Sequence, residues 1–253
     1  MEVVRGVSDP CLSPDGTKLA YTANTKDGGR ILKVIDINTK VKIILNTNSN
    51  NCYGAVWSPD GKYIAYNVFD AAKSKWSIAV IDAANTMQPN VLTGQLEQSY
   101  MPTWLADSKS VVVQNMDNVF VFDLSGNISA TYKISDIARG APGLDNNTGP
   151  SSADRFVFTA DGSKIVFSSE VDEPGGQDGP PNGVFVYDVS SRSTLRLSPK
   201  GYFAGGVFIK GNKVLFTGSK LKSTVSNVYT VDLDGKNFKI LFPGCADISA
   251  KNQ

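Results

Sequence analysis

The sequence contains no histidine among its 253 residues. Without imidazole there is no Ser-His-Asp or Cys-His nucleophilic pair, no histidine general base and no zinc site that depends on histidine. Much of ordinary hydrolase chemistry is therefore excluded. The sequence favours a protein that is not an enzyme and that needs no cofactor.

An excess of charge of one sign is also missing. The chain has 25 Lys and Arg against 24 Asp and Glu, a formal net charge of +1, and its basic residues form no run. Nucleic acids and anionic membrane surfaces attract clustered basic residues. The composition therefore predicts no nucleic-acid partner.

Long hydrophobic runs are absent as well. The longest, such as 78–81 and 119–122, have four residues, whereas a membrane helix needs about 20. The first residues, 1–6, have neither the basic start nor the long apolar stretch of a signal peptide. We expect no membrane span and no signal peptide in this chain.

Cysteine is scarce. The three cysteines, Cys11, Cys52 and Cys245, show no C-x-x-C spacing, so the sequence indicates neither a zinc site nor a disulfide framework. Two alternatives stay open: buried thiols, or a disulfide between Cys11 and Cys245, which lie near the two ends of the chain.

The clearest positive feature is an internal repeat. One motif reads LSPDGTKLAYTA (12–23), WSPDGKYIAYNV (57–68), WLADSKSVVVQN (104–115), FTADGSKIVFSS (158–169) and FIKGNKVLFTG (208–218). A second, apolar motif follows each copy, at 33–45, 78–92, 119–134, 184–197 and 228–241. The turn aspartates Asp15, Asp60, Asp107 and Asp161 are 45, 47 and 54 residues apart. This is the period of a propeller blade.

Each repeat has the pattern of four short strands. Pro-Asp-Gly and Ala-Asp-Gly fit tight turns, Val, Ile, Tyr and Phe dominate the flanking runs, and no helical periodicity persists. The predicted fold is all-β, a β-propeller of four-stranded antiparallel blades in a single domain over 1–253. The predicted blades cover about 7–46, 53–94, 100–135, 152–198 and 203–243, with 2–6 as an extra outer strand.

The unit W-S-P-D-G-K-x-I-A-Y, complete at 57–66 and nearly so at 12–21, resembles the WD-like repeat of TolB-type propellers. The resemblance covers almost the whole chain. It implies a periplasmic or secreted location and non-catalytic binding of a protein or peptide, or a scaffold role. The same repeat is similar to that of peptidase propellers and oligogalacturonate lyases, so a polysaccharide lyase or hydrolase-type propeller enzyme is an alternative.

Only five full repeats are recognisable, and the tail 245–249 resembles the start of a further inner strand. Three interpretations stay open: a closed five-bladed ring, part of a propeller with a sixth blade, and a protomer that completes a blade with its neighbour. The last would make the chain a subunit of a surface or fibrous assembly, joined by strand exchange at its termini.

Candidate binding residues precede the corner of each repeat. In a propeller of this type the segment before the corner lines the central channel. Three and four residues before the corners at 12, 57, 104, 158 and 208, the sequence offers Asp9, Tyr53, Tyr100, Asp154 and Arg155. Because Tyr and Arg dominate binding hot spots, these positions predict a recognition surface at the channel mouth. The alternative is that Arg155 pairs with Asp154 or Asp9 and lines a wet channel.

Two long loops, 139–152 and 170–183, interrupt the regular spacing. The second carries four carboxylates, Glu170, Asp172, Glu173 and Asp178, which are weak candidates for a hard cation such as calcium. No EF-hand spacing is present, so we expect no metal site here and a solvated acidic loop instead.

Overall fold

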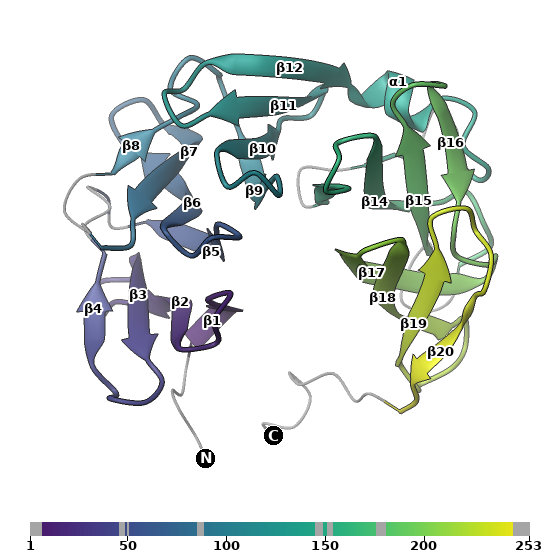
Figure 1. Cartoon of the computed structure of the whole chain (residues 1–253), viewed down its shortest axis with the longest axis horizontal. Helices are drawn as coiled ribbons and strands as arrows, with labels where there is room; N and C mark the ends of the chain where they lie inside the picture. The colour runs from purple at the N-terminus through teal and green to yellow at the C-terminus, as the bar shows by residue number, and fades with distance from the viewer. Residues whose placement is uncertain are drawn as a thin grey trace. The chain divides into compact units, whose positions relative to one another are not determined.

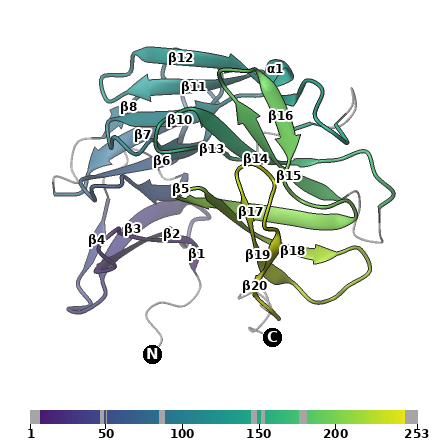
Figure 2. The ribbon, with the colours of Figure 1, turned by 45° about the vertical axis from the view of Figure 1, so that its right-hand side comes forward.

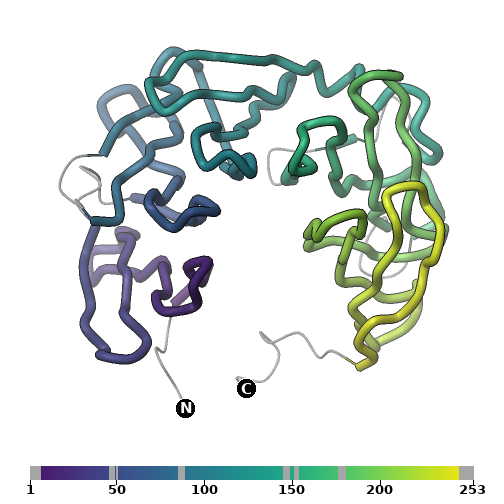
Figure 3. Tube along the Cα trace, in the orientation of Figure 1, coloured from purple at the N-terminus to yellow at the C-terminus, as the bar shows by residue number. Residues whose placement is uncertain are grey.

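The computed structural model describes residues 7–45, 49, 51–84, 89–144, 149–150, 154–175 and 181–244. Within these ranges the chain forms strands β1 to β20 and one short helix, α1 (Ile134–Ala138) (Figure 1). Every sheet has four antiparallel strands in sequential order, so each blade is a meander of hairpins. The hairpins can be followed along the chain trace in Figure 3.

The five sheets, numbered as blades 1 to 5, follow one another along the sequence. Blade 1 holds β1 (Val7–Leu12), β2 (Lys18–Asn24), β3 (Arg30–Asp36) and β4 (Lys42–Ile44). Blade 2 holds β5 (Cys52–Trp57), β6 (Tyr63–Asp70), β7 (Lys75–Asp82) and β8 (Asn90–Val91). Blade 3 holds β9 (Tyr100–Trp104), β10 (Ser110–Gln114), β11 (Asn118–Asp123) and β12 (Ile128–Lys133). Blade 4 holds β13 (Phe156–Phe158), β14 (Lys164–Glu170), β15 (Asn182–Asp188) and β16 (Ser193–Arg196). Blade 5 holds β17 (Tyr202–Lys210), β18 (Lys213–Lys220), β19 (Asn227–Asp232) and β20 (Lys239–Phe242) (Figure 2).

The predicted fold class is confirmed: the chain is all-β, with five blades of four antiparallel strands. The chain divides into two compact units, Met1–Thr131 and Tyr132–Gln253. Unit 1 contains blades 1 to 3 up to the middle of β12, and unit 2 contains blades 4 and 5. The single-domain assignment stays a prediction. The extra strand expected at 2–6, the tail at 245–249 and Cys245 lie outside the described residues.

The hairpin corners explain why the repeat keeps its aspartates. The Asp15 carboxylate accepts hydrogen bonds from the Thr17 amide at 3.0 Å and from the Ser13 hydroxyl at 2.6 Å. Gly16 then takes the left-handed conformation, with φ +71°. The third repeat lacks this glycine, and Ser108 adopts the same conformation at φ +57°. The turn geometry is therefore kept even where the residue best suited to it is missing.

Within unit 1, two tryptophans join successive blades. The Trp57 indole donates to the Cys11 carbonyl at 3.1 Å, and the Trp104 indole donates to the Val56 carbonyl at 3.1 Å. Each ring belongs to the inner strand of one blade and reaches the inner strand of the blade before it. Buried aliphatic side chains fill the space between the sheets. The corner aromatic therefore fixes neighbouring blades by packing and by a hydrogen bond.

The inner strand of blade 5 differs by one residue from the sequence alignment. Its hairpin turns over two residues between Lys210 and Lys213 and has no turn aspartate. The strand pairing makes Ile209, not Phe208, the structural equivalent of Trp57, because Ile209 pairs with Val214 as Trp57 pairs with Ile64. Ile209 packs against the core of unit 2, whereas Phe208 is 60% exposed. The alignment on Phe208 was therefore wrong by one position, because the shorter turn removes residues after the corner.

Candidate functional site

Four inner strands contain the same irregularity. Strands β1, β5, β9 and β17 each have a β-bulge, and its first residue is in the left-handed region: Asp9 at φ +50°, Gly54 at +67°, Met101 at +52° and Gly206 at +60°. A bulge redirects the backbone and frequently lies next to a functional site. Asp9 and Met101 are not glycines, so the left-handed conformation is strained at these two positions, and the fold nevertheless keeps it.

A polar side chain of the second strand lies beside this segment in blade after blade. Thr22 donates to the Asp9 carboxylate at 3.2 Å, and Thr217 donates to the Gly205 carbonyl at 3.1 Å. Asn67 is fully buried, donates to the Tyr53 carbonyl at 3.2 Å and accepts from the Met101 amide at 3.2 Å. These contacts hold the irregular inner strands in place. The sequence signal was a polar residue directly after the apolar run of each first motif.

Three of the predicted site residues lie in unit 1. Asp9 is exposed in β1, whereas Tyr53 and Tyr100 are half-buried near the first residues of β5 and β9. The Tyr100 hydroxyl lies 3.3 Å from Oε1 of Gln98, which also accepts the backbone amide of Trp76 at 2.9 Å. The Trp76 ring meets the Tyr53 ring edge-on, with the centroids 5.1 Å apart. The two predicted tyrosines therefore belong to one connected cluster.

An arginine that the sequence analysis missed completes this cluster. The Arg30 guanidinium carbon lies 4.7 Å from the centroid of the Tyr53 ring and 5.5 Å from that of Trp76. Its Nε donates to Oδ1 of Asn51 at 2.9 Å. Phe69 supports Trp76 with a centroid distance of 5.1 Å. Arg30, Tyr53, Trp76, Phe69 and Asn51 form what we call the arginine–aromatic cluster.

The other two predicted residues lie in unit 2, directly before β13. The Asp154 carboxylate accepts from the Ser168 hydroxyl at 3.4 Å, which is the blade 4 version of the contact described for Thr22. Arg155 is exposed and forms no ion pair with a described residue of unit 2. The alternative pairing of Arg155 with Asp154 is therefore not observed within unit 2, and the joint recognition surface stays a prediction.

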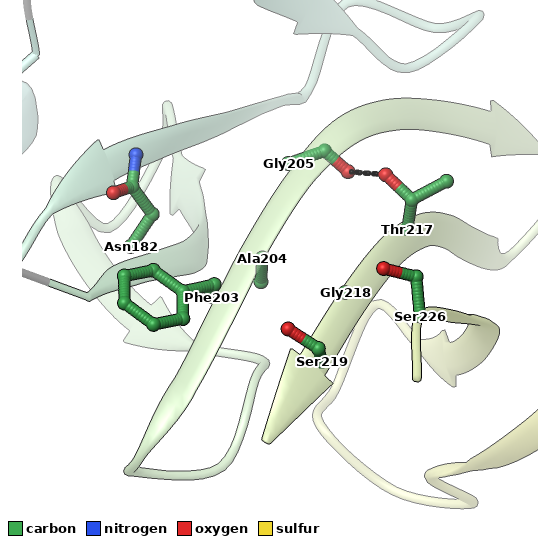
Figure 4. Close-up of a pocket in the computed structure, with 8 residues that line it drawn as sticks. All are labelled: Asn182, Phe203, Ala204, Gly205, Thr217, Gly218, Ser219 and Ser226. Atoms are coloured by element: carbon green, nitrogen blue, oxygen red, sulfur yellow. Dashed lines mark hydrogen bonds between the residues drawn. The ribbon is translucent and has the colours of Figure 1, made fainter. Parts of the chain in front are cut away.

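Unit 2 also contains a pocket of about 250 Å³ over β17 and β18. Its lining consists of Asn182, Phe203, Ala204, Gly205, Thr217, Gly218, Ser219 and Ser226. In Figure 4, the Phe203 ring and the Asn182 amide lie on one side of β17, and the hydroxyls of Ser219 and Ser226 lie on the other. The side chains of Asn182, Ser219 and Ser226 have no hydrogen-bond partner among the described residues.

Glycine forms the floor of this pocket. A Cβ atom at Gly205 would meet nothing within 4 Å, and the residue has no positive φ. A side chain there would therefore project into the pocket without backbone strain. At Gly218 a Cβ atom would come within 2.7 Å of the Phe203 carbonyl oxygen, so the two strands approach closely only because that residue is glycine.

The arginine–aromatic cluster and the pocket of unit 2 both contain residues from one position of the repeat. This position lies six residues before the aspartate that ends the third strand of each blade. The residues there are Arg30, Trp76, Asp117, Asn182 and Ser226. An otherwise regular apolar repeat thus carries a different polar or aromatic residue at the same place in every blade. This variation was the sequence signal for Arg30, Trp76, Asn182 and Ser226, because a position that only packs the core would have stayed apolar.

The acidic loop is only partly solvated. Glu173 is paired with Arg196, with side-chain exposures of 10% and 6%, and its Oε2 accepts the Gly201 amide at 2.9 Å. Burial raises the pKa of Glu173, but the hydrogen bonds from Arg196 and Gly201 outweigh this and hold the pKa below its usual value. The expectation of a wholly solvated loop was therefore wrong at this residue.

The remaining acidic candidates do not form a metal site within the part of the chain that the structure describes. Glu170 and Asp172 are exposed, Asp178 lies outside the described residues, and no group of three Asp, Glu or Cys side chains there could hold a metal ion. Likewise, none of the described helical residues provides a segment long and apolar enough to cross a membrane.

Comparisons with known proteins support the fold. A putative TolB from Agrobacterium tumefaciens is similar with a TM-score of 0.65 and 19% identity, over 94% of this chain and 82% of that one. TolB from Acinetobacter baumannii is similar with a TM-score of 0.60 and 18% identity, over 94% of this chain and 54% of that one. A puromycin-hydrolyzing peptidase from Mycobacterium tuberculosis is similar with a TM-score of 0.63 and 15% identity, over 95% of this chain and 38% of that one.

No protein-family description matches the sequence, and no curated protein matches it. The similarity at these identities establishes the TolB-type propeller fold, which peptidase propellers share. The resemblance predicted from the repeats is confirmed at this level.

Proposed function

We propose that this chain is a non-catalytic propeller that binds a protein or peptide partner outside the cytoplasm, with the glycine-floored pocket of unit 2 as a contact point. The observation that carries the proposal is the lining of that pocket, where none of the eight residues is an acid, a base or a cysteine. Such a lining offers no general acid, general base or activated nucleophile. It does offer hydrogen bonds and an aromatic face.

The chemistry of the pocket suits an extended peptide segment. Asn182, Ser219 and Ser226 present a donor or acceptor each without a described partner. A peptide main chain supplies one N–H and one C=O per residue and can pair with all three. The Phe203 ring gives an apolar surface for a side chain of the partner.

The experiment starts from a phage-displayed library of random twelve-residue peptides selected on the wild-type chain. Selected peptides are then titrated against Gly205→Leu, which fills the pocket without backbone strain. We expect a loss of affinity of about tenfold or more, equal to about 1.4 kcal/mol. Gly149→Leu is the matched control, because Gly149 also has no positive φ and its Cβ would also meet nothing within 4 Å.

Failure to enrich any peptide, or equal binding by wild type and Gly205→Leu, would refute the proposal. The peptidase propellers among the similar structures make an enzymatic role the competing class. Release of product from a selected peptide on prolonged incubation with the purified chain would favour that class.

A second function, self-assembly through the outer strands, has one specific observation in its favour. The outer strand β20 exposes Ile240, Leu241 and Phe242 by 50%, 39% and 57%. An exposed apolar edge strand is a template for pairing with another chain. Native mass spectrometry over a concentration series tests this function: multiples of the chain mass that disappear in Phe242→Lys would support it, and one species at the chain mass would count against it.

A further inference from the structure

Arg30 is a half-buried cation without an acidic partner in the described part of the chain. It begins β3, at the end of blade 1 that lies against Asn51 in a parallel bridge. No described carboxylate forms an ion pair with it. A partly desolvated arginine is usually paired, because removing a charge from water without compensation is unfavourable.

The guanidinium is held in a fixed orientation. The Asn51 side-chain oxygen accepts a hydrogen bond from the Nε of Arg30. The centroids of the Tyr53 and Trp76 rings lie 4.7 and 5.5 Å from the guanidinium carbon. Cation–π contacts of this kind contribute about 0.5–2 kcal/mol each. Because the side chain is already immobilised, a ligand that binds it does not have to order a flexible arginine.

Two donor groups of Arg30 remain available. Neither Nη1 nor Nη2 has a hydrogen-bond partner among the described residues. The parallel N–H bonds of a guanidinium match the two oxygens of a carboxylate or phosphate group. The fixed guanidinium can therefore donate two parallel hydrogen bonds to an anion.

The surroundings favour a carboxylate over a phosphate. The nearby Lys75 points its ammonium at the carbonyls of Gly94 and Leu96, at 2.6 and 2.8 Å, so Arg30 is the one cation of the cluster. A single charge suits a monoanion. The adjacent aromatic rings of Tyr53 and Trp76 provide a surface for an apolar or aromatic group on the same ligand.

We propose that the arginine–aromatic cluster binds a carboxylate attached to an apolar or aromatic carrier, such as the C-terminal residue of a peptide. Arg30 contacts the carboxylate, and Tyr53 and Trp76 contact the carrier. The site goes beyond the proposed function, because it lies in unit 1 and shares no residue with the pocket of unit 2.

The test follows the side-chain Nε–Hε resonances of the chain labelled with ¹⁵N-arginine. The Arg30 signal is identified by its loss in Arg30→Lys. The probes are N-acetylphenylalanine, its C-terminal amide, acetate and inorganic phosphate. We expect a saturable shift of the Arg30 signal with N-acetylphenylalanine at an affinity about tenfold above that for acetate, and no shift with the amide.

Variants separate recognition from folding. Asn51→Ala keeps the arginine but releases its Nε, and we expect it to weaken binding of N-acetylphenylalanine severalfold. Arg139→Gln is the control, because Arg139 is an exposed arginine with 78% of its side chain accessible and an ion pair to Asp136. It should bind as the wild type does.

An Arg30 signal that does not shift, or that shifts equally with the amide or with acetate, would overturn the inference. Tighter binding of phosphate than of N-acetylphenylalanine would overturn it as well. Neither result bears on the pocket of unit 2, since Gly205→Leu should leave the response of Arg30 unchanged.

Discussion

Replacing Glu173 by glutamine should destabilise unit 2 although the change adds or removes no volume. The carboxylate is 10% exposed, pairs with Arg196 and accepts the Gly201 amide at 2.9 Å. Arg196 itself is 6% exposed and also donates to the carbonyls of Ser198 at 3.0 Å and Pro199 at 3.3 Å. The pair therefore ties the loop after β14 to the segment that connects blades 4 and 5.

The magnitude follows from what each variant leaves behind. Removing one member of a buried pair costs about 3–5 kcal/mol, because the other charge stays buried. Alanine at Glu173 should lie at the lower end, about 3 kcal/mol, since two carbonyls still accept from Arg196. Glutamine at Glu173 keeps one acceptor oxygen but loses the charge, so we expect Glu173→Gln to lower the free energy of unfolding by about 2 kcal/mol.

The double variant Glu173→Leu with Arg196→Met is the decisive comparison. It removes both charges and should regain most of the stability lost in Glu173→Ala. The assay is urea unfolding followed by far-UV circular dichroism, because Trp57, Trp76 and Trp104 all lie in unit 1 and tryptophan fluorescence does not report on unit 2. A cost below about 0.5 kcal/mol for Glu173→Gln would refute the reasoning.

The pH dependence has a defined sign. The pKa of Glu173 is lowered in the folded state, so its contribution is complete above the unfolded pKa of about 4.3 and is lost as the pH falls below it. The penalty of Glu173→Gln should therefore be largest near pH 7 and shrink below about pH 4. A penalty that does not change with pH would show that the lost charge is not its cause.

Three further outcomes are expected. Gly54→Ala should cost about 1–2 kcal/mol more than Gly16→Ala in urea unfolding, because both residues are left-handed but only at Gly54 would the new Cβ come within 2.9 Å of Asn67; equal costs would contradict this. Trp57→Phe should cost about 1–2 kcal/mol by the same assay, because it removes the indole donor to the part-buried Cys11 carbonyl of β1; a smaller loss than in a control Trp76→Phe would count against it. The pKa of Asp161 is lowered to about 2 by the Thr159 hydroxyl and the Ser163 amide, so wild-type stability should fall as the pH drops from about 4 to about 2, and Asp161→Asn should lose that part of the dependence in acid titrations monitored by circular dichroism.

The fold could be predicted from the sequence because each copy of the repeat specifies the strands and turns of one blade. Each Asp-Gly corner caps its own turn with a carboxylate, so a local motif specifies a local structure that recurs at a blade-sized period. The error came where the motif degenerates. In blade 5 the turn is built on Gly211 without an aspartate, and the aromatic at 208 was aligned although Ile209 takes its place in the core.

The candidate site was only partly predictable, and the reason is geometric. Tyr53 and Tyr100 were found because they stand next to the corner in sequence. Arg30 was missed because it lies 23 residues before Tyr53 and meets it only through the packing of blade 1 on blade 2. Glu173 was taken for a solvated residue because its partner, Arg196, is the last residue of β16, 23 residues further along the chain.

Hydrogen–deuterium exchange of the wild-type chain, with and without a saturating peptide from the phage selection, tests the central claim most directly. If the pocket over β17 and β18 recognises the partner, exchange should slow in these two strands, where Gly205 and Thr217 pair, and remain unchanged in the outer strand β20. Slower exchange confined to β20 and the other outer strands would contradict the account and make strand pairing between molecules the better explanation.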